Sequence, residues 1–304
     1  GNIGKPALDI LPKLKKNSLA VLELSSFQLQ DLHKSPRVAV ITNITSDHLD
    51  PSGKFRAASH QTAKEYFGAK LNIISYQKKN DFAVINPALK KRLGQIGQAK
   101  KIYYDISLYH TIFEKAGNKN LKGFHNLQNF AAAAEAGKIF RVSLKKIIEA
   151  VRKFKGVEHR LEFVKKINGV SFYNDSAATN PDAALAALKS FKEPLHLILG
   201  GYDKGLNYKK LADYISKSKN IKTIALIVQL KNKLYKLLKN KPRKNLLIRK
   251  EKTLKDAFLT AYRNCDKNET VLLSPAAASF DMFQNYAKRG EEFKKLVRKL
   301  QQRS

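Results

Sequence analysis

The chain is 304 residues long and carries 58 Lys and Arg against 25 Asp and Glu, a formal net charge of +33. Its length predicts two domains, each large enough for a core of its own. The absence of an apolar run of about 18 residues excludes a membrane-spanning helix. The single cysteine excludes an internal disulfide framework and indicates a reducing cytoplasm, and no His/Cys spacing typical of zinc sites occurs.

The positive charge is spread through the whole chain. Such an excess suits nucleic acid, a membrane surface or a phosphate-rich substrate. However, the lysines form no tail, stripe or Arg-rich arm, and they lack the interleaved aromatic residues of a single-strand binding surface. We therefore interpret most of them as a solvated surface and keep nucleic-acid binding as the minor alternative.

The N-terminal residues are predicted to form a loop, a helix and a strand. The loop GNIGKP precedes a helix from Ala7 to Leu14, and residues 19–24, LAVLEL, are predicted to form a buried strand. Glu23, Ser25 and Gln28 then lie at or just beyond the end of that strand. A Gly-x-x-Gly loop of this kind needs a strand before it, so we expect the chain to be the later part of a longer protein.

A second strand is predicted at residues 38–43, followed by Asp47, His48 and Asp50. Strands that alternate with helices predict a mainly parallel sheet, whose ligands bind at the carboxyl ends of the strands. Glu23 and His48 therefore form a candidate divalent-metal site, one hard oxygen and one imidazole, that suits nucleotide-bound Mg²⁺. Each residue alone is a weak signal, because a lone histidine is usually structural.

The remainder of the first half continues the alternation. Helices are predicted at residues 55–73, 121–140 and 144–154, the last capped by Ser143, and strands at 81–86 and 100–105. Asn126 and Asn129 share a face near the start of the long helix, where they could bond the edge of a base. Asn126 could equally cap the helix.

The stretch from Gly156 to Pro181 predicts a hairpin followed by a helix. Two alternating runs flank Asn168-Gly169, a strong hairpin signal because both residues tolerate the positive φ of a type I′ turn. Polar residues then lead to Asn180 as an N-cap and Pro181 as the first helical residue. This strand-to-helix turn suits an anion or a ribose, although a simple capped turn explains the same pattern.

Beyond Pro181 the pattern repeats. Strands are predicted at residues 195–201, 223–228, 246–250 and 271–273, with helices between them and a final helix at 279–300. Three strand ends, at Asp175, Gly201 and Ser274, carry polar or glycine-rich loops. In an open parallel sheet these ends lie along one edge, so we expect a ligand crevice that draws on all three.

Nine short motifs occur in the order typical of the Mur ligases: GNIGxP, LELSSFQL, DHLD, AKxNI, HNxxN, HRxE, NDSxATN, GGYDKG and LLSPAxASFDxF…RGxxF. The likeness spans nearly the whole chain, which most resembles the D-glutamate-adding group. The resemblance implies an α/β fold: a truncated P-loop-type central domain with a mainly parallel sheet at residues 1–156, and a Rossmann-like amino-acid-binding domain at 157–304. It also implies ATP- and Mg²⁺-dependent amide formation in cytoplasmic peptidoglycan synthesis. There the alanyl carboxylate of UDP-N-acetylmuramoyl-L-alanine is phosphorylated, and D-glutamate attacks the acyl phosphate.

The resemblance also implies site residues by position. Glu23 and His48 resemble the metal-associated pair, and Lys70 resembles a lysine that is carbamylated to make an extra acidic metal ligand. Lys64 is the alternative, because the spacing from His48 to Lys70 is longer than usual. The implied substrate contacts are Asn2, Ser25 and Gln28 for the UDP substrate, Asn129, Arg160 and Asp175 for ATP, and Thr179, Lys204, Ser279 and Tyr286 for D-glutamate. Tyr286 replaces Phe, and Ala177 stands where Lys is common, which leaves one phosphate or carboxylate contact open.

The sequence contains no G-x-x-x-x-G-K-[ST] loop. In the Mur ligases this phosphate-binding loop lies upstream, together with a domain that holds the UDP moiety. We expect these parts in cis or on a split partner, and little ligation from the present residues alone. Two alternatives stay open: another amide ligase of the superfamily, adding a different amino acid or extending a polyglutamate, and a non-catalytic nucleotide- or nucleic-acid-binding fragment.

Overall fold

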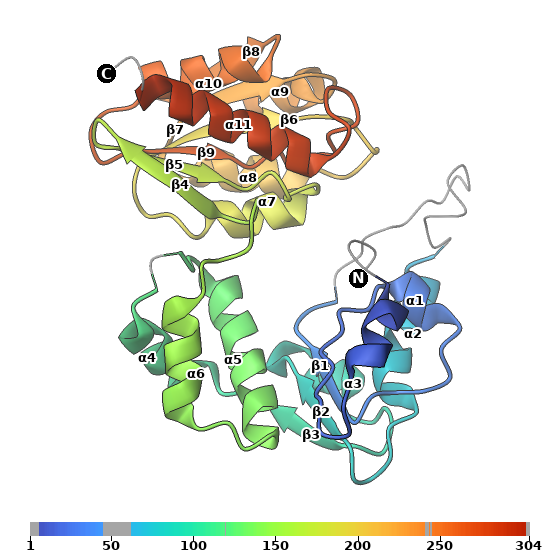
Figure 1. Cartoon of the computed structure of the whole chain (residues 1–304). Coiled ribbons are helices and arrows are strands. Elements are labelled where there is room, and N and C mark those ends of the chain that lie inside the picture. Colours follow the sequence, from blue (N-terminus) through green and yellow to red (C-terminus); the bar gives the residue numbers. More distant parts are fainter. Residues whose placement is uncertain (1–5, 45–61, 119, 241–242, 244, 302–304) are drawn as a thin grey trace. The chain divides into compact units, whose positions relative to one another are not determined.

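The chain divides into two compact units (Figure 1). The computed structural model describes residues 6–44, 62–118, 120–240, 243 and 245–301. The first unit comprises residues 1–115 and 127–149, and the second comprises residues 116–126 and 150–304. Each unit has its own sheet and its own buried apolar core. Within the described residues, no helix is both long and apolar enough to cross a membrane.

The first unit is built on a parallel sheet of three described strands in the order β1-β2-β3. The strands are β1 (Val38–Ile41), β2 (Phe82–Ile85) and β3 (Lys100–Tyr103). Ala39 and Ile41 of β1 pack with Ile74 and Leu93 in the core beneath the sheet. These strands confirm the ones predicted at residues 38–43, 81–86 and 100–105.

The first half contains helices, several of which begin at a residue whose side chain caps them. They are η1 (Ala7–Lys13), α1 (Ser26–Gln30), α2 (Ala63–Ser75), η3 (Pro87–Leu89), α3 (Lys90–Leu93), α4 (Ile106–Ala116), α5 (Phe124–Ile139) and α6 (Leu144–Lys153). Ser143 caps α6 as predicted, because its hydroxyl accepts from the amide of Lys146. The helix predicted at residues 55–73 corresponds to α2 over its described part. The first predicted helix is instead the 3₁₀ helix η1, which contains Pro12 and buries none of its side chains.

Residues 19–24 form no strand, so the expectation of a buried strand there is wrong. Leu19, Val21 and Leu22 are 56%, 87% and 51% exposed. A strand persists only where a neighbour accepts its backbone hydrogen bonds. None of the strands in the described sheet pairs with this segment, although its apolar composition alone resembles a buried strand.

The second unit contains a six-stranded sheet in the order β4-β5-β9-β6-β7-β8. The strands are β4 (Glu162–Ile167), β5 (Val170–Asn174), β6 (Leu195–Gly200), β7 (Ile221–Ile227), β8 (Leu247–Glu251) and β9 (Thr270–Leu273). Only β4 and β5 are antiparallel among these pairs, and the hairpin between them is confirmed. Asn168 and Gly169 have φ values of 51° and 82°, as a type I′ turn requires.

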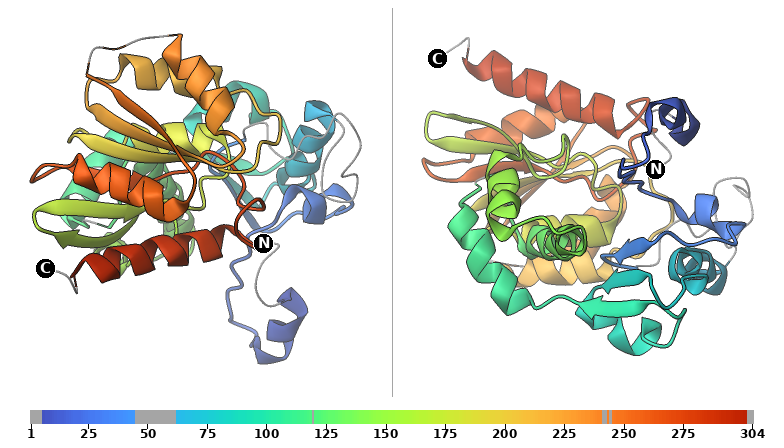
Figure 2. Two further views of the ribbon diagram at one scale, coloured as in Figure 1. Left: turned by 90° about the horizontal axis from the view of Figure 1, so that it is seen from above. Right: turned by 60° about the horizontal axis from the view of Figure 1, so that its bottom comes forward.

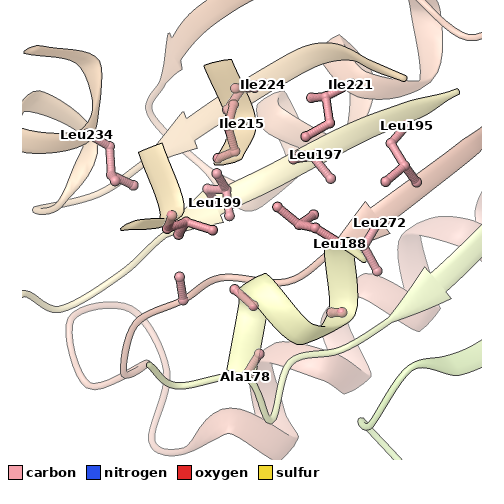
Figure 3. Packing of buried hydrophobic residues seen from close by; sticks show 14 of the residues in the cluster. Ala178, Leu188, Leu195, Leu197, Leu199, Ile215, Ile221, Ile224, Leu234 and Leu272 are labelled. Atoms are coloured by element: carbon pink, nitrogen blue, oxygen red, sulfur yellow. The ribbon is translucent and has the colours of Figure 1, made fainter. Parts of the chain in front are cut away.

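Helices cover both faces of this sheet (Figure 2). One face packs against α7 (Pro181–Leu188), α8 (Lys209–Lys217) and α9 (Lys231–Lys239), and the other against α10 (Leu254–Arg263) and α11 (Tyr286–Gln301). Figure 3 shows Leu195, Leu197 and Leu199 of β6 meeting Leu188 and Leu272 in the first of these layers. Every residue of β6 is buried, as expected of a central parallel strand between two helical layers.

The last helix begins later than the sequence predicts. The predicted helix starts at Ser279, whereas α11 starts at Tyr286. Asn285 marks this start, because its side chain accepts from the amide of Lys288 at 2.9 Å. The amides of Met282 and Phe283 both donate to the carbonyl of Ser279, which closes a tight turn instead. The helix N-terminus expected behind Ser279 is therefore wrong.

Candidate active site

The first unit contains a pocket of about 410 Å³ beside the carboxyl end of β1. Its polar lining consists of Glu23, Thr42, Asn43 and Lys70. Apolar residues from the segment 19–24 and from α1, β1 and α2 complete its wall. Thr42 and Asn43 directly follow β1, at the edge where parallel sheets bind ligands. Two of the three residues predicted for the metal site, Glu23 and Lys70, thus line one cavity. The third, His48, lies outside the described residues.

The geometry distinguishes the two candidate lysines. Lys70 is half-buried on α2, and its Nζ lies 5.1 Å from the centre of the Tyr66 ring. Lys64 is exposed and is not among the residues that line the pocket. The Glu23 carboxylate, with the oxygens of Thr42 and Asn43, offers the hard ligands that Mg²⁺ prefers. The pocket therefore fits a magnesium ion.

Ser25 and Gln28 form reciprocal hydrogen bonds at the start of α1. The Ser25 hydroxyl accepts from the Gln28 amide at 3.3 Å, and Gln28 Oε1 accepts from the Ser25 amide at 3.0 Å. This capping box explains both residue types without a ligand. A contact with the UDP substrate stays a prediction, as it does for Asn2, which lies outside the described residues.

In the second unit, the carboxyl ends of β5, β9 and β6 lie side by side at one edge of the sheet. Hydrogen bonds join the loops that follow these strands. Ser274 Oγ donates to Asp175 Oδ2 at 2.7 Å, and the amide of Tyr202 donates to the carbonyl of Ala278 at 2.9 Å. The predicted convergence of the three strand ends is confirmed.

Two glycines allow the loop after β6 to pass this crowded edge. Gly200 and Gly201 have φ values of 121° and 152°. A Cβ at Gly200 would lie 2.2 Å from the carbonyl oxygen of Ile227, and one at Gly201 would lie 2.3 Å from that of Ala278. Because both neighbours are backbone atoms, only glycine fits at either position.

Asp175 lies buried beneath these loops. Besides the bond from Ser274, its Oδ1 accepts from the amide of Leu161 at 3.1 Å. Burial raises the pKa of Asp175 to about 7, although these hydrogen bonds and the charges of Arg160 and Arg289 act in the opposite direction. Asp175 therefore holds the His-Arg turn against the strand end, and its contact with ATP stays a prediction.

The predicted ATP contacts are divided between the two units. Asn129 is exposed on α5 in the first unit, whereas Arg160 and Asp175 belong to the second. Arg160 is exposed on the turn before β4. Burial lowers the pKa of His125, and the positive charge of Arg160 lowers it further. Arg160 thus places a cation beside a neutral imidazole, which suits an anionic group.

Lys204 projects from the loop after β6. Its Nζ lies 5.9 Å from the centre of the Phe280 ring, which is 66% exposed. The adjacent Asp203 pairs with Lys233 at 2.9 Å, and its other oxygen accepts from the amide of Gly205 at 2.9 Å. Lys233 already neutralises Asp203, so the loop is held in place by contacts that do not involve Lys204. The exposed ammonium group of Lys204 therefore lies at the carboxyl-end edge of the sheet.

The other predicted D-glutamate contacts come from neighbouring loops. Thr179 is half-buried in the loop after β5, just before α7, and Ser279 is almost fully buried in the loop after β9. Tyr286 is half-buried at the start of α11, where its carbonyl accepts from Ser176 Oγ at 2.7 Å. The structure thus brings Thr179, Lys204 and Ser279 to one sheet edge on three different loops.

Comparison with known proteins identifies the family. Residues 5–142 match the Mur ligase middle domain, and residues 159–277 match the domain described as Mur ligase, glutamate ligase domain. The UDP-N-acetylmuramoylalanine–D-glutamate ligase of Acetivibrio thermocellus is 38% identical over 327 residues, which cover 99% of this chain and 68% of the relative. The same enzyme of Clostridium tetani is 38% identical over 323 residues, with the same coverage. The chain belongs to the Mur ligase family. The members of this family are ATP-dependent amide ligases.

Solved Mur ligases share the fold at low sequence identity. UDP-N-acetylmuramate-alanine ligase from Thermotoga maritima aligns with a TM-score of 0.56 and 16% identity, covering 92% of this chain and 62% of that one. UDP-N-acetylmuramoylalanyl-D-glutamyl-2,6-diaminopimelate–D-alanyl-D-alanyl ligase from Acinetobacter baumannii aligns with a TM-score of 0.57 and 15% identity, covering 91% of this chain and 60% of that one. The present chain thus spans about two thirds of its curated Mur relatives and somewhat less of these solved structures.

Arg289 organises this Mur ligase site, although no role for it was predicted beyond its place in the RGxxF motif. It is 1% exposed on α11. Its guanidinium donates to Ser176 Oγ at 3.0 Å, to the Ser176 carbonyl at 2.9 Å, and to the carbonyls of Ala277 and Ala278 at 3.0 and 3.2 Å. Burial lowers the pKa of Arg289 to about 10, which still leaves it charged near neutral pH. One cation therefore ties the loop after β5 to the loop after β9. Its sequence signal is an arginine on the same helical face as the buried Phe293.

A second missed contact joins two Mur motifs. His159 is buried with a φ of 65°, and its ring lies against Gly290 of α11. A Cβ at Gly290 would lie 2.2 Å from His159 Nδ1. That nitrogen is 2.9 Å from Asn174 Nδ2, which links the ring to the end of β5. The HRxE and RGxxF motifs therefore meet in space, and the glycine provides the room.

Proposed function

We propose that this chain carries out, within a D-glutamate-adding Mur ligase, the ATP-dependent ligation of D-glutamate to UDP-N-acetylmuramoyl-L-alanine in cytoplasmic peptidoglycan synthesis. The observation that carries the proposal is similarity over 99% of the chain to enzymes with that name, at 38% identity in two of them. The three convergent loops of the second unit support it, because they supply chemistry suited to an amino acid with two carboxylates.

The second unit is the proposed amino-acid-binding domain, residues 157–304. D-glutamate must be held by its carboxylates so that its neutral amine can attack the acyl phosphate. Lys204 supplies a cation for one carboxylate through a charge-assisted hydrogen bond. The hydroxyls of Thr179 and Ser279 bind the remaining oxygens, and the N-terminus of α7 adds positive potential beside Thr179. Tyr286 closes the site from the start of α11.

The proposed central domain, residues 1–156, holds the metal. Glu23 lines the pocket with Lys70, and His48 completes the proposed set of ligands. A carbamate on Lys70 would turn a cation into a carboxylate, which strengthens the pocket's preference for a divalent ion. A magnesium ion held by these residues would supply positive charge against the transferred phosphoryl group. The proposed ATP contacts are Asn129, Arg160 and Asp175, and those to the UDP substrate are Asn2, Ser25 and Gln28.

The test uses a chimera that joins residues 1–304 to the part of the Acetivibrio thermocellus ligase that they do not match. We expect phosphate release that depends on both D-glutamate and UDP-N-acetylmuramoyl-L-alanine. Losing a charge-assisted contact costs about 2–3 kcal/mol, so Lys204→Ala should raise the KM for D-glutamate about 30- to 150-fold. The KM for ATP should stay the same.

Lys209→Ala is the matched control, because Lys209 is an exposed lysine of the same region, at the start of α8. It should leave both Michaelis constants unchanged. Equal shifts of the two constants in Lys204→Ala would remove Lys204 from the glutamate site. Efficient use of a different amino acid in place of D-glutamate would contradict the proposed substrate.

A further inference from the structure

A histidine, a cysteine and a glutamate meet at the edge of the second sheet opposite the active-site loops. His196 lies at the amino end of β6, Glu269 directly precedes β9, and Cys265 follows α10. One imidazole nitrogen, the thiol sulfur and one carboxylate oxygen all lie within 4.8 Å of one another. Because β6 and β9 are parallel, their amino ends are the far side of the sheet from Gly201 and Ser274. The proposed ligase chemistry uses none of these three side chains.

The histidine of this cluster has an unsatisfied nitrogen. His196 is 1% exposed, and its Nε2 lies 2.7 Å from Glu269 Oε2. Its Nδ1 is also buried and has no hydrogen-bond partner in the described part of the chain. A buried polar atom left in this way costs about 1–3 kcal/mol, so His196 is not fully satisfied by its bond to Glu269 alone.

Among the described residues, no lysine or arginine forms an ion pair with the carboxylate of this cluster, so its negative charge is available to a bound cation. A second group, Glu158, His159 and Glu162, has similar spacing, but there Lys294 bonds to both glutamates and already supplies the positive charge. Glu269 instead bonds to His196 and to the amide of Asp266 at 3.0 Å. Lys222 lowers the pKa of Glu269 by its charge, but makes no ion pair with it within the described residues.

We propose that His196, Cys265 and Glu269 bind a zinc ion. Thiolate, imidazole and carboxylate are the donors that zinc takes in proteins, usually in a tetrahedron completed by a fourth ligand such as water. Zinc–ligand distances of about 2.0–2.3 Å place tetrahedral ligand atoms about 3.3–3.8 Å apart. Small side-chain rotations would separate His196 Nε2 from Glu269 Oε2, now 2.7 Å apart, and adjust the other separations, which are within 4.8 Å. Zn²⁺ with one thiolate and one carboxylate is electrically neutral, which suits a buried site.

Proton release accompanies binding at this site. Burial raises the pKa of the Cys265 thiol above its usual range, and the charges of Glu269 and Asp266 raise it further. Zinc binding replaces the thiol proton, which leaves to solvent, and joins the end of α10 to β6 and β9.

Cobalt(II) provides the spectroscopic test on the untagged 304-residue chain, stripped of metal with a chelator. We expect visible d–d absorption and a near-ultraviolet thiolate-to-cobalt charge-transfer band that saturate at one ion per chain. Because Cys265 is the sole cysteine of the sequence, no other residue can produce that band. Zinc should displace the cobalt. Cys265→Ser should abolish the band, whereas Glu158→Gln, in the second group, should leave it unchanged.

Thiol reactivity tests the same site in the unmodified protein, so it does not depend on the folding of a variant. One equivalent of zinc should slow the reaction of Cys265 with a disulfide reagent at least tenfold, and chelator should restore the rate. A cobalt spectrum without the charge-transfer band, or a reaction rate that zinc does not change, overturns the proposal.

Discussion

Replacing Arg289 with methionine tests whether one buried cation holds the active-site loops together. Methionine keeps an apolar side chain of similar length on α11 but removes every donor. The carbonyls of Ser176 and Ala277 then lose the donor that Arg289 gave them, whereas the Ala278 carbonyl keeps the Tyr202 amide and the Ser176 hydroxyl keeps its bond to the Tyr286 carbonyl. The loops after β5 and β9 should separate from α11 and become more dynamic.

The expected cost follows from two opposing effects. Each carbonyl left buried without a donor costs about 1–3 kcal/mol, so the two of them cost about 2–6 kcal/mol. Removing the buried charge recovers part of this, because a desolvated ion is itself costly. Since disrupting a buried ionic network typically costs about 3–5 kcal/mol, we expect the second unit to lose that much stability.

Hydrogen exchange of the β5 and β9 amides is the appropriate assay, because it reports the opening free energy of the second unit alone. Arg298→Met is the control on the same helix, where the side chain is exposed, and should change stability by no more than about 0.5 kcal/mol. An Arg289→Met protein that loses less than about 1 kcal/mol would refute the reasoning, since that is roughly the net worth of a single ordinary hydrogen bond.

Three further changes follow from the geometry. Gly290→Ala should destabilise the second unit by about 1–3 kcal/mol despite the helix propensity of alanine, because its Cβ would meet a histidine nitrogen at 2.2 Å; thermal unfolding measures this. In the wild type, the buried Asp175 should make the free energy of unfolding fall as the pH rises from about 4 to about 7, and Asp175→Asn should remove that fall. The folded pKa of about 7 lies above the ordinary carboxyl pKa of 3.8, so ionisation opposes folding in that window, by at most about 4 kcal/mol. In the chimera, Lys70→Ala should abolish ligation, and a small carboxylate should partly restore it.

Each of these changes has its own control. Gly68→Ala on α2 places a Cβ where nothing lies within 4 Å, so it should stabilise by about 0.5–1 kcal/mol. The pH effect is read as the difference between wild type and Asp175→Asn, because buried histidines with lowered pKa values, such as His159, add the opposite slope. Lys64→Ala should retain ligation. A stabilising Gly290→Ala, an unchanged pH profile, or loss and rescue at Lys64 instead would each contradict the corresponding prediction.

The sequence predicted the parts of the fold that depend on neighbouring residues. The hairpin at Asn168-Gly169 and the cap at Asn180 rest on local φ preferences and local hydrogen bonds, and both occur. Strand order was not needed to predict the convergence of Asp175, Gly201 and Ser274, because parallel strands always end at the same edge. The strand predicted at residues 19–24 does not form, because a strand needs a neighbouring strand to pair with, and the sequence of the segment alone does not show whether one is present.

The site was only partly predictable for the same reason. Glu23 and Lys70 share a cavity, as their motifs suggested, but the clamp made by Arg289 reaches back 113 residues to Ser176. The pair His196 and Glu269 is separated by 73 residues, and no spacing rule for metal ligands covers that distance. Such contacts are created by strand order and helix packing, so they become visible only in the folded chain.

The contact between His159 and Gly290 constrains how this protein can diverge. A left-handed histidine and a helical glycine share one space, so position 290 cannot gain a side chain while the ring at 159 stays where it is. An ancestor that acquired a side chain at position 290 would have had to shrink or remove the ring at 159 at once, and would thereby have shifted Arg160 beside it. Two motifs that are far apart in the gene therefore form one unit of evolutionary change.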